Sequence, residues 1–146
     1  MVRRRQWGTR KFLLTADGFS KISHCLLGDE YVLAGSSKRA IVDQETSMPI
    51  HFVLTGEHPS HRATMVIYPK PAGREFEGVM YLNLSDLIET KVAAGMAPAG
   101  IRHLGDVVAL IRARRLSAQF RELLNESVRD EYDRLWNAVR DTPEEH

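Results

Sequence analysis

The spacing of the hydrophobic residues changes near Ser85, and this change limits the fold more than any other feature of the chain. Before it, short apolar runs such as "KFLLT", "YVLAG" and "IHFVL" alternate with polar, Gly- and Pro-containing turns, as in strands. After it, apolar residues recur at the spacing of amphipathic helices. We therefore predict one α+β domain over residues 1–146, with a small mixed β-sheet and a flanking helix in a β-rich part (1–84) and about four helices in a helical part (85–146).

The β-rich part is expected to begin with a strand and a helix. Thr15 is placed to N-cap this helix, whose Phe19, Ile22 and Leu26 share one face, and Gly28 is placed to end it. Strands are predicted at residues 11–15, 31–35, 39–43, 50–55, 64–71 and 78–84.

In the helical part, Ser85 is the expected N-cap of a helix over 86–95. The following helix, over 99–115, is predicted to bury one stripe formed by Ile101, Leu104, Val108 and Ile111, with Val107 beside it. Two further helices are predicted at 117–124 and 127–141.

Length and composition exclude several classes of protein. A chain of 146 residues with 43% hydrophobic and 27% charged residues can bury a core, and no apolar run approaches the roughly 18 residues of a membrane-spanning helix. The start, "MVRRRQWGTRK", lacks the apolar segment of a signal peptide. We therefore expect a cytoplasmic protein with no membrane partner, in which the single cysteine, Cys25, is a small core residue.

The basic start allows two interpretations. Five of the first eleven residues are Arg or Lys and none is acidic, so this segment could approach the phosphates of a nucleotide or of RNA. It could equally be a solvated terminus, which we favour because no other feature indicates a nucleic acid partner.

Two interpretations also remain open for Lys91, whose stem falls on the expected buried face of helix 86–95. Taken alone, such a lysine most simply lays its stem over apolar surface and keeps its ammonium in water. Alternatively, the ammonium enters a cleft between helix and sheet and binds an anion. On the next helix, Arg102 and Asp106 can form an i,i+4 ion pair, which contributes only about 0–1 kcal/mol when exposed.

Other patterns of catalytic sites are missing. The histidines do not have the spacing of metal ligands, and the glycines form neither a phosphate-binding loop nor a nucleophile elbow. We therefore predict no metal site. His51 lies on the predicted strand 50–55, on the face opposite Ile50, Phe52 and Leu54, where packing is the simpler explanation for a histidine.

Several stretches, in order, resemble small bacterial and phage proteins of the nucleotidyltransferase superfamily, including minimal nucleotidyltransferases and abortive-infection toxins. They are "FLLTADGF", "DQETSMPIHFVLTGEHP", "MVIYPKPA", "LNLSDLIETKVAAGM", "IRHLGDVVALIRARRLSAQF" and "VRDEYDRLW", and the resemblance covers residues 5–139. It implies the DNA polymerase β-like fold, with Mg²⁺ and an NTP as cofactors. It also implies Mg²⁺-dependent transfer of a nucleotidyl group from the NTP to an acceptor.

The metal-binding carboxylates that this resemblance implies are missing. The family's Asp-x-Asp falls on Thr9, Arg10 and Lys11, and its third aspartate falls on His51. A lysine repels Mg²⁺ and a neutral histidine is a poor ligand for it. The family's first strand, helix and glycine turn would precede Arg5, so the chain resembles an N-terminally truncated member.

Part of the family's pattern is present in the helical part. Lys91 and Asp106 match it, and Arg102 stands where a lysine is usual, whereas Gly100 and His103 replace an arginine and an aspartate. The resemblance therefore assigns Lys91, Asp106, Arg102 and His51 to the catalytic site. We expect Lys91, Arg102 and Lys11 to hold a phosphate or nucleotide without a metal.

Three functional hypotheses follow, beside the alternative of a soluble α+β protein of unrelated function. The first is a degenerate nucleotidyltransferase that retains at most nucleotide or phosphate binding. The second is one half of a split or truncated active enzyme. The third is an antitoxin-like or oligomeric binding module, because loss of a first strand exposes a sheet edge that a second copy or a small helical protein could cover.

Overall fold

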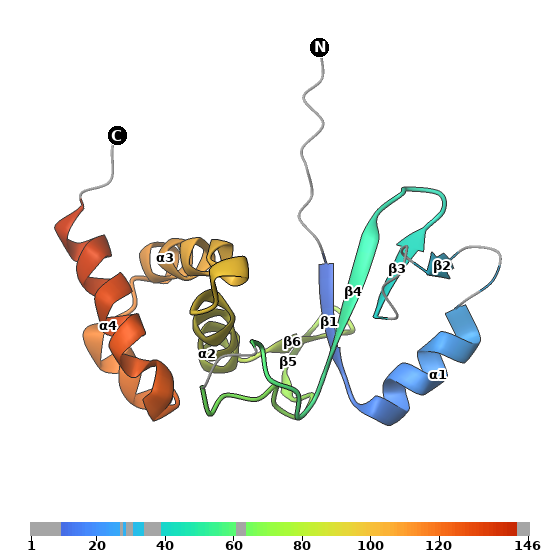
Figure 1. The fold of residues 1–146 in the computed structure, drawn as a ribbon, viewed down its shortest axis with the longest axis horizontal. Coiled ribbons are helices and arrows are strands. Elements are labelled where there is room, and N and C mark those ends of the chain that lie inside the picture. The colour runs from blue at the N-terminus through green and yellow to red at the C-terminus, as the bar shows by residue number, and fades with distance from the viewer. Residues whose placement is uncertain (1–9, 27, 29–30, 34–38, 61–63, 143–146) are drawn as a thin grey trace, which may run out of the picture. The chain divides into compact units, whose positions relative to one another are not determined.

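The computed structural model describes residues 10–26, 28, 31–33, 39–60 and 64–142 (Figure 1). The chain divides into two compact units, Met1–Thr55 and Gly56–His146, here called the first and the second unit. Strands and helices occur in both units, so the coarse prediction of an α+β protein is confirmed. Whether the two units form a single domain stays a prediction.

The first unit is a four-stranded sheet with one helix. Its elements in chain order are β1 (Arg10–Leu14), α1 (Ala16–Leu26), β2 (Tyr31–Leu33), β3 (Ala40–Asp43) and β4 (Pro49–Leu54). The strand order is β1-β4-β3-β2, with β1 parallel to β4 and the other pairs antiparallel. The parallel β1–β4 pair explains the helix between them, because parallel neighbours need a long crossover connection.

Local signals in the sequence account for these elements. The Thr15 hydroxyl accepts a hydrogen bond from the Gly18 N–H at 3.0 Å, as expected of an N-cap at the start of α1. On β4, Phe52 and Leu54 are buried, and the Phe19 ring of α1 packs against Phe52 with 5.7 Å between centroids. The predicted amphipathic faces of helix and strand therefore meet in one small core.

The second unit is mainly helical. Its elements are β5 (Gly73–Phe76), β6 (Val79–Leu82), α2 (Leu84–Gly95), the 3₁₀ helix η1 (Pro98–Gly100), α3 (Arg102–Arg114), the 3₁₀ helix η2 (Ala118–Leu123) and α4 (Glu126–Asp141). One apolar core joins the helices, with Ile88 and Val92 of α2, Val107 and Ile111 of α3, and Val128, Tyr132 and Leu135 of α4 among its buried members.

Two predictions about the β-rich part are wrong. The predicted strand 64–71 is not a strand, because its end carries Pro69 and Pro71, which have no N–H to donate to a ladder. The backbone of Tyr68 forms hydrogen bonds with Gly56 and Glu57, and the Met65 N–H donates to the Ser127 hydroxyl, but none of these is a bond between strands. Cys25, expected in the core, is exposed, since it lies on the outer side of the amphipathic α1.

Three details of the helical part also differ from the prediction. Asn83, rather than Ser85, is the N-cap of α2, and no side-chain capping bond forms there. The helix predicted at 117–124 is the 3₁₀ helix η2. Ile101 is 67% exposed, because the buried stripe of α3 is centred on Val107 and Ile111, with Leu104 and Val108 at its margins. Among the described residues, no helix is both long and apolar enough to cross a membrane.

Candidate functional site

Lys91 and Asp106, the two residues that match the nucleotidyltransferase pattern, form an ion pair. The Lys91 Nζ lies 2.8 Å from Asp106 Oδ2, and their side chains are 26% and 56% exposed. His103, one turn before Asp106 on α3, places its Nδ1 3.9 Å from the same carboxylate oxygen. The Lys91 ammonium is therefore already engaged by an anionic partner within the protein.

Arg102 was expected to lie in this cluster, but it does not. It is exposed at the start of α3, and the structure pairs Asp106 with Lys91 rather than with Arg102. The i,i+4 pair between Arg102 and Asp106 that the sequence allows is absent from the ion pairs of the described residues. The cation that reaches Asp106 comes instead from the neighbouring helix α2, where Lys91 donates a hydrogen bond to it.

The other two predicted site residues lie in the first unit. Lys11 of β1 and His51 of β4 are register partners in the parallel pair, so their side chains belong to the same face of the sheet, opposite that of Phe52. Each of the two units thus brings together only its own members of the predicted site. Thr9 lies outside the described residues.

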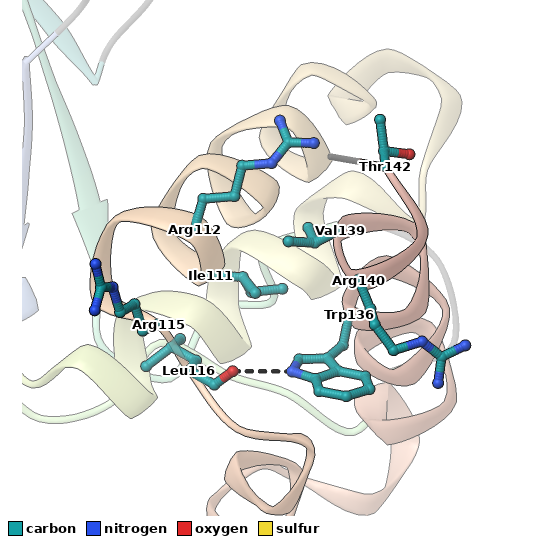
Figure 2. Close-up of a pocket in the computed structure, with 8 residues that line it drawn as sticks. All are labelled: Ile111, Arg112, Arg115, Leu116, Trp136, Val139, Arg140 and Thr142. Carbon is teal, nitrogen blue, oxygen red and sulfur yellow. Dashed lines mark hydrogen bonds between the residues drawn. The ribbon is translucent and has the colours of Figure 1, made fainter. Parts of the chain in front are cut away.

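A different group of basic side chains lines a groove between α3 and α4 (Figure 2). The groove has a volume of about 490 Å³. Its apolar lining is formed by Ile111, Leu116, Trp136 and Val139. Arg112, Arg115, Arg140 and Thr142 complete it, so three guanidinium groups border one aliphatic and aromatic surface.

The Trp136 indole is fixed in this groove by its own hydrogen bond. Its Nε1–H donates to the Leu116 carbonyl oxygen at 2.9 Å, as the dashed line in Figure 2 shows. One turn earlier on α4, the Tyr132 hydroxyl donates to the carbonyl of Ser117 at 2.9 Å. Burial, with a smaller effect of Asp133, raises the pKa of Tyr132 to about 12. These two bonds hold the segment after α3 against α4.

The three arginines of the groove differ in their partners. Arg140 pairs with Asp141 at 2.8 Å, which lowers the pKa of that carboxyl, and its guanidinium carbon lies 5.6 Å from the Trp136 ring centroid. Arg115 is the exposed C-cap of α3, in the left-handed conformation with φ 49°. The Arg112 Nε is buried and has no hydrogen-bond acceptor among the described atoms.

Part of this positive charge has a structural explanation. Arg112 and Arg115 stand at the C-terminal end of α3, where the helix dipole favours cations. A buried N–H without an acceptor, however, costs free energy in any apolar setting. Figure 2 shows the Arg112 guanidinium extending toward Thr142 at one end of the groove, with those of Arg115 and Arg140 directed to opposite sides. Because the Arg112 Nε is closed to solvent, an anion bound at this end would contact the Nη groups of the guanidinium instead.

The sequence contains two signals for this groove. The run "IRARRL" concentrates Arg112, Arg114 and Arg115 at one helix end. Trp136 and Arg140 are four residues apart on α4 and therefore share a face. Among the described residues, no cluster of three or more His, Cys, Asp or Glu side chains has the arrangement of a metal site.

In comparisons with models of protein families, with curated proteins and with solved structures, the chain matches none. The resemblance to nucleotidyltransferases therefore stays a prediction that rests on the quoted stretches of sequence. The observed fold defines only a coarser class, an α+β protein with a four-stranded mixed sheet and a separate unit of a hairpin and packed helices.

Proposed function

We propose that this chain is a nucleotidyltransferase-like protein that no longer transfers nucleotidyl groups and instead binds a nucleotide in the groove between α3 and α4. The observation that carries the proposal is the groove itself, in which Arg112, Arg115 and Arg140 border one apolar surface with Trp136. Guanidinium groups bind phosphate through paired hydrogen bonds, and an apolar surface with an indole suits a base or ribose. Phosphates held by Arg112 at its end of the groove would leave the base to contact Trp136 and its neighbours.

The resemblance supports the loss of catalysis independently of the groove. The positions at which the family binds Mg²⁺ carry Thr9, Lys11 and His51, none of which is a carboxylate. Without such ligands, the in-line displacement at the α-phosphate lacks its metal-ion stabilisation. Binding is therefore expected to be independent of Mg²⁺ at the protein.

The Lys91–Asp106 pair makes the groove the better candidate for phosphate. To bind an anion, Lys91 would have to leave a carboxylate 2.8 Å away or share its ammonium with it. Asp106 and Arg112 are six residues apart on α3, about 9 Å along the axis, so the two sites are separable by mutation.

Isothermal titration with ATP, in EDTA and then in Mg²⁺, tests the proposal. The wild-type protein should bind ATP in both buffers, and the double variant Arg112→Gln, Arg115→Gln should bind at least tenfold more weakly. Arg102→Gln is the matched control, because it removes an exposed arginine from the opposite end of the same helix, and it should bind as the wild type does.

Three results would overturn parts of the proposal. Unchanged ATP binding by the double variant would show that the groove is not the binding site. Loss of ATP binding in Lys91→Met, with normal binding by the Arg112→Gln, Arg115→Gln variant, would show that the nucleotide binds at Lys91, as the sequence alone suggested. Mg²⁺-dependent incorporation of labelled nucleotide into any acceptor would show that transfer is retained.

A further inference from the structure

The strands β5 and β6 form a two-stranded sheet, and its outer edges are open as far as the described residues go. Its loop has only two residues, Glu77 and Gly78, whose φ angles of 50° and 78° are those of a type I′ turn. Neither strand pairs with a further strand among the described residues. An isolated hairpin is at best marginally stable in water, so an additional strand would stabilise it.

The hairpin exposes large hydrophobic side chains. The register pairs Phe76 with Val79 and Arg74 with Tyr81, so these four residues share one face, and Met80 lies on the other. Phe76, Val79, Met80 and Tyr81 are 63%, 46%, 57% and 56% exposed. This concentration of exposed apolar surface on one small element is typical of an interaction surface.

The two edges of the hairpin differ in charge. Strand β5 carries Arg74 and Glu75, with Glu77 next in the loop, whereas no residue of β6 is charged. Charged residues on an edge strand oppose pairing with another strand, and their absence permits it. The β6 edge is therefore the one that is open to a partner strand.

A second copy of the same chain fits this edge. When two copies of one strand pair antiparallel about a two-fold axis, one residue lies at the axis and faces the same residue of the other copy. Residues at equal distances before and after it then face each other. With Met80 at the centre, Val79 faces the partner copy's Tyr81 and Tyr81 faces its Val79. Pairs of aromatic and β-branched residues are favourable across strands, and no like charges meet. By contrast, two-fold pairing through β5 centred on either of its charged residues would place Arg74 against Arg74 or Glu75 against Glu75.

The backbone groups agree with this register. In a two-residue hairpin, the residues that flank the loop, Phe76 and Val79, form the first hydrogen-bonded pair, and the pattern alternates from there. The N–H and C=O of Met80 therefore point away from β5 toward the open edge. We propose that the protein forms a homodimer in which the β6 strands of two copies pair antiparallel about Met80, giving the four-stranded sheet β5-β6-β6-β5. This dimer does not depend on nucleotide binding.

Light scattering after size exclusion tests the dimer with the full chain. The wild-type protein should have a mass twice the 16.6 kDa of one chain. Met80→Lys and Met80→Glu should each be monomeric, because residue 80 faces itself at the symmetry axis. An equimolar mixture of the two variants should recover the dimer, since lysine then faces glutamate. Met65→Lys is the control outside the hairpin, at a side chain that is 77% exposed, and it should remain dimeric.

Cross-linking provides a second test that does not depend on a charged variant folding. Directly opposed residues of a hydrogen-bonded pair have Cα atoms about 5.5 Å apart, which suits a disulfide. In a Cys25→Ser background, Met80→Cys should form a disulfide-linked dimer in air, and Glu75→Cys on the other strand should not. A monomeric wild type, a dimeric Met80→Lys variant, or equal cross-linking at positions 75 and 80 would overturn the proposal.

Discussion

The ammonium of Lys91 lies 2.8 Å from the carboxylate of Asp106, and this ion pair joins α2 to α3 across fifteen residues of sequence. Its two side chains are 26% and 56% exposed, so water screens the pair and its net contribution to stability is expected to be about 0–1 kcal/mol. His103 stands 3.9 Å from the same carboxylate, with a side chain that is 13% exposed. These contacts indicate a modest role in helix packing.

A double-mutant cycle of Lys91→Met and Asp106→Asn measures this contribution. Methionine keeps the unbranched stem over the apolar surface, and asparagine keeps an oxygen acceptor, so each variant removes mainly charge. We expect a coupling free energy of about 0.5–1 kcal/mol at low ionic strength, falling toward zero at high salt. Urea unfolding of the four proteins gives the value. A coupling above about 3 kcal/mol would mean that the pair behaves as a buried one.

The close approach of α2 and α3 leads to a second prediction. A Cβ added at Gly95, buried near the end of α2, would overlap Leu104 Cδ2 and lie 3.2 Å from the Leu104 backbone N. Gly95→Ala must therefore push α3 away or distort Leu104, and we expect it to destabilise the protein by about 1–3 kcal/mol. Thermal unfolding followed by circular dichroism measures this loss.

Gly105→Ala is the matched control for Gly95→Ala. A Cβ at Gly105, on the exposed face of α3, would meet no atom within 4 Å. Alanine there should stabilise the protein by about 0.5–1 kcal/mol, because glycine loses more backbone entropy in a helix. Equal effects of the two substitutions would show that Gly95 does not set the helix spacing.

The sequence predicted those elements whose local signals agree with their packing. Thr15 caps α1 as expected. Phe52 and Leu54 of β4 are buried as expected, because alternate residues of a strand lie on the same face and a shift by one residue would expose both. The prediction was wrong where such signals were weak or mixed. Residues 64–71 have the apolar pattern of a strand, but prolines end the segment and no partner strand pairs with it. Strand β5 was missed, because Phe76 is its single apolar residue beside a glycine and two charged residues.

The sequence predicted less of the candidate site than of the fold. The sequence places Lys91 on a helix face, but only the structure shows that its ammonium meets Asp106 rather than solvent. The groove depends on a contact between residues at least twenty positions apart, such as Leu116 and Trp136. No periodicity within one helix reveals such a contact, because it arises from how α3 and α4 cross.

Glu89 leads to a prediction about pH. From α2, its Oε1 accepts a hydrogen bond from the backbone N–H of Asn125, the N-cap of α4, whose own Oδ1 accepts from the Ser127 N–H at 3.0 Å. Burial raises the pKa of Glu89 above its usual value of 4.5, the Asn125 bond opposes this, and the charge of Asp86 adds to it. Folding thus shifts the protonation equilibrium of Glu89 toward the neutral carboxyl, relative to the unfolded chain.

The sign of the effect follows from this direction. Because the folded-state pKa lies above the unfolded one, the contribution of Glu89 to stability is fully present below about pH 4.5 and is lost as the pH rises through the folded-state pKa. Glu89→Gln keeps the acceptor for the Asn125 N–H and removes the ionisation. We therefore expect it to raise the melting temperature at pH 7 relative to the wild type, with the difference vanishing near pH 4.

Glu126→Gln is the control for Glu89→Gln, and it should have the opposite sign at pH 7. Glu126 is exposed in the first turn of α4, where its negative charge is favoured by the helix dipole, so neutralising it should cost about 0.3–1 kcal/mol. Melting curves of both variants between pH 4 and pH 7 separate the two effects. If Glu89→Gln lowered the melting temperature at pH 7 as Glu126→Gln does, the Glu89 carboxylate would be stabilised by its bond to Asn125 more than it is penalised by burial.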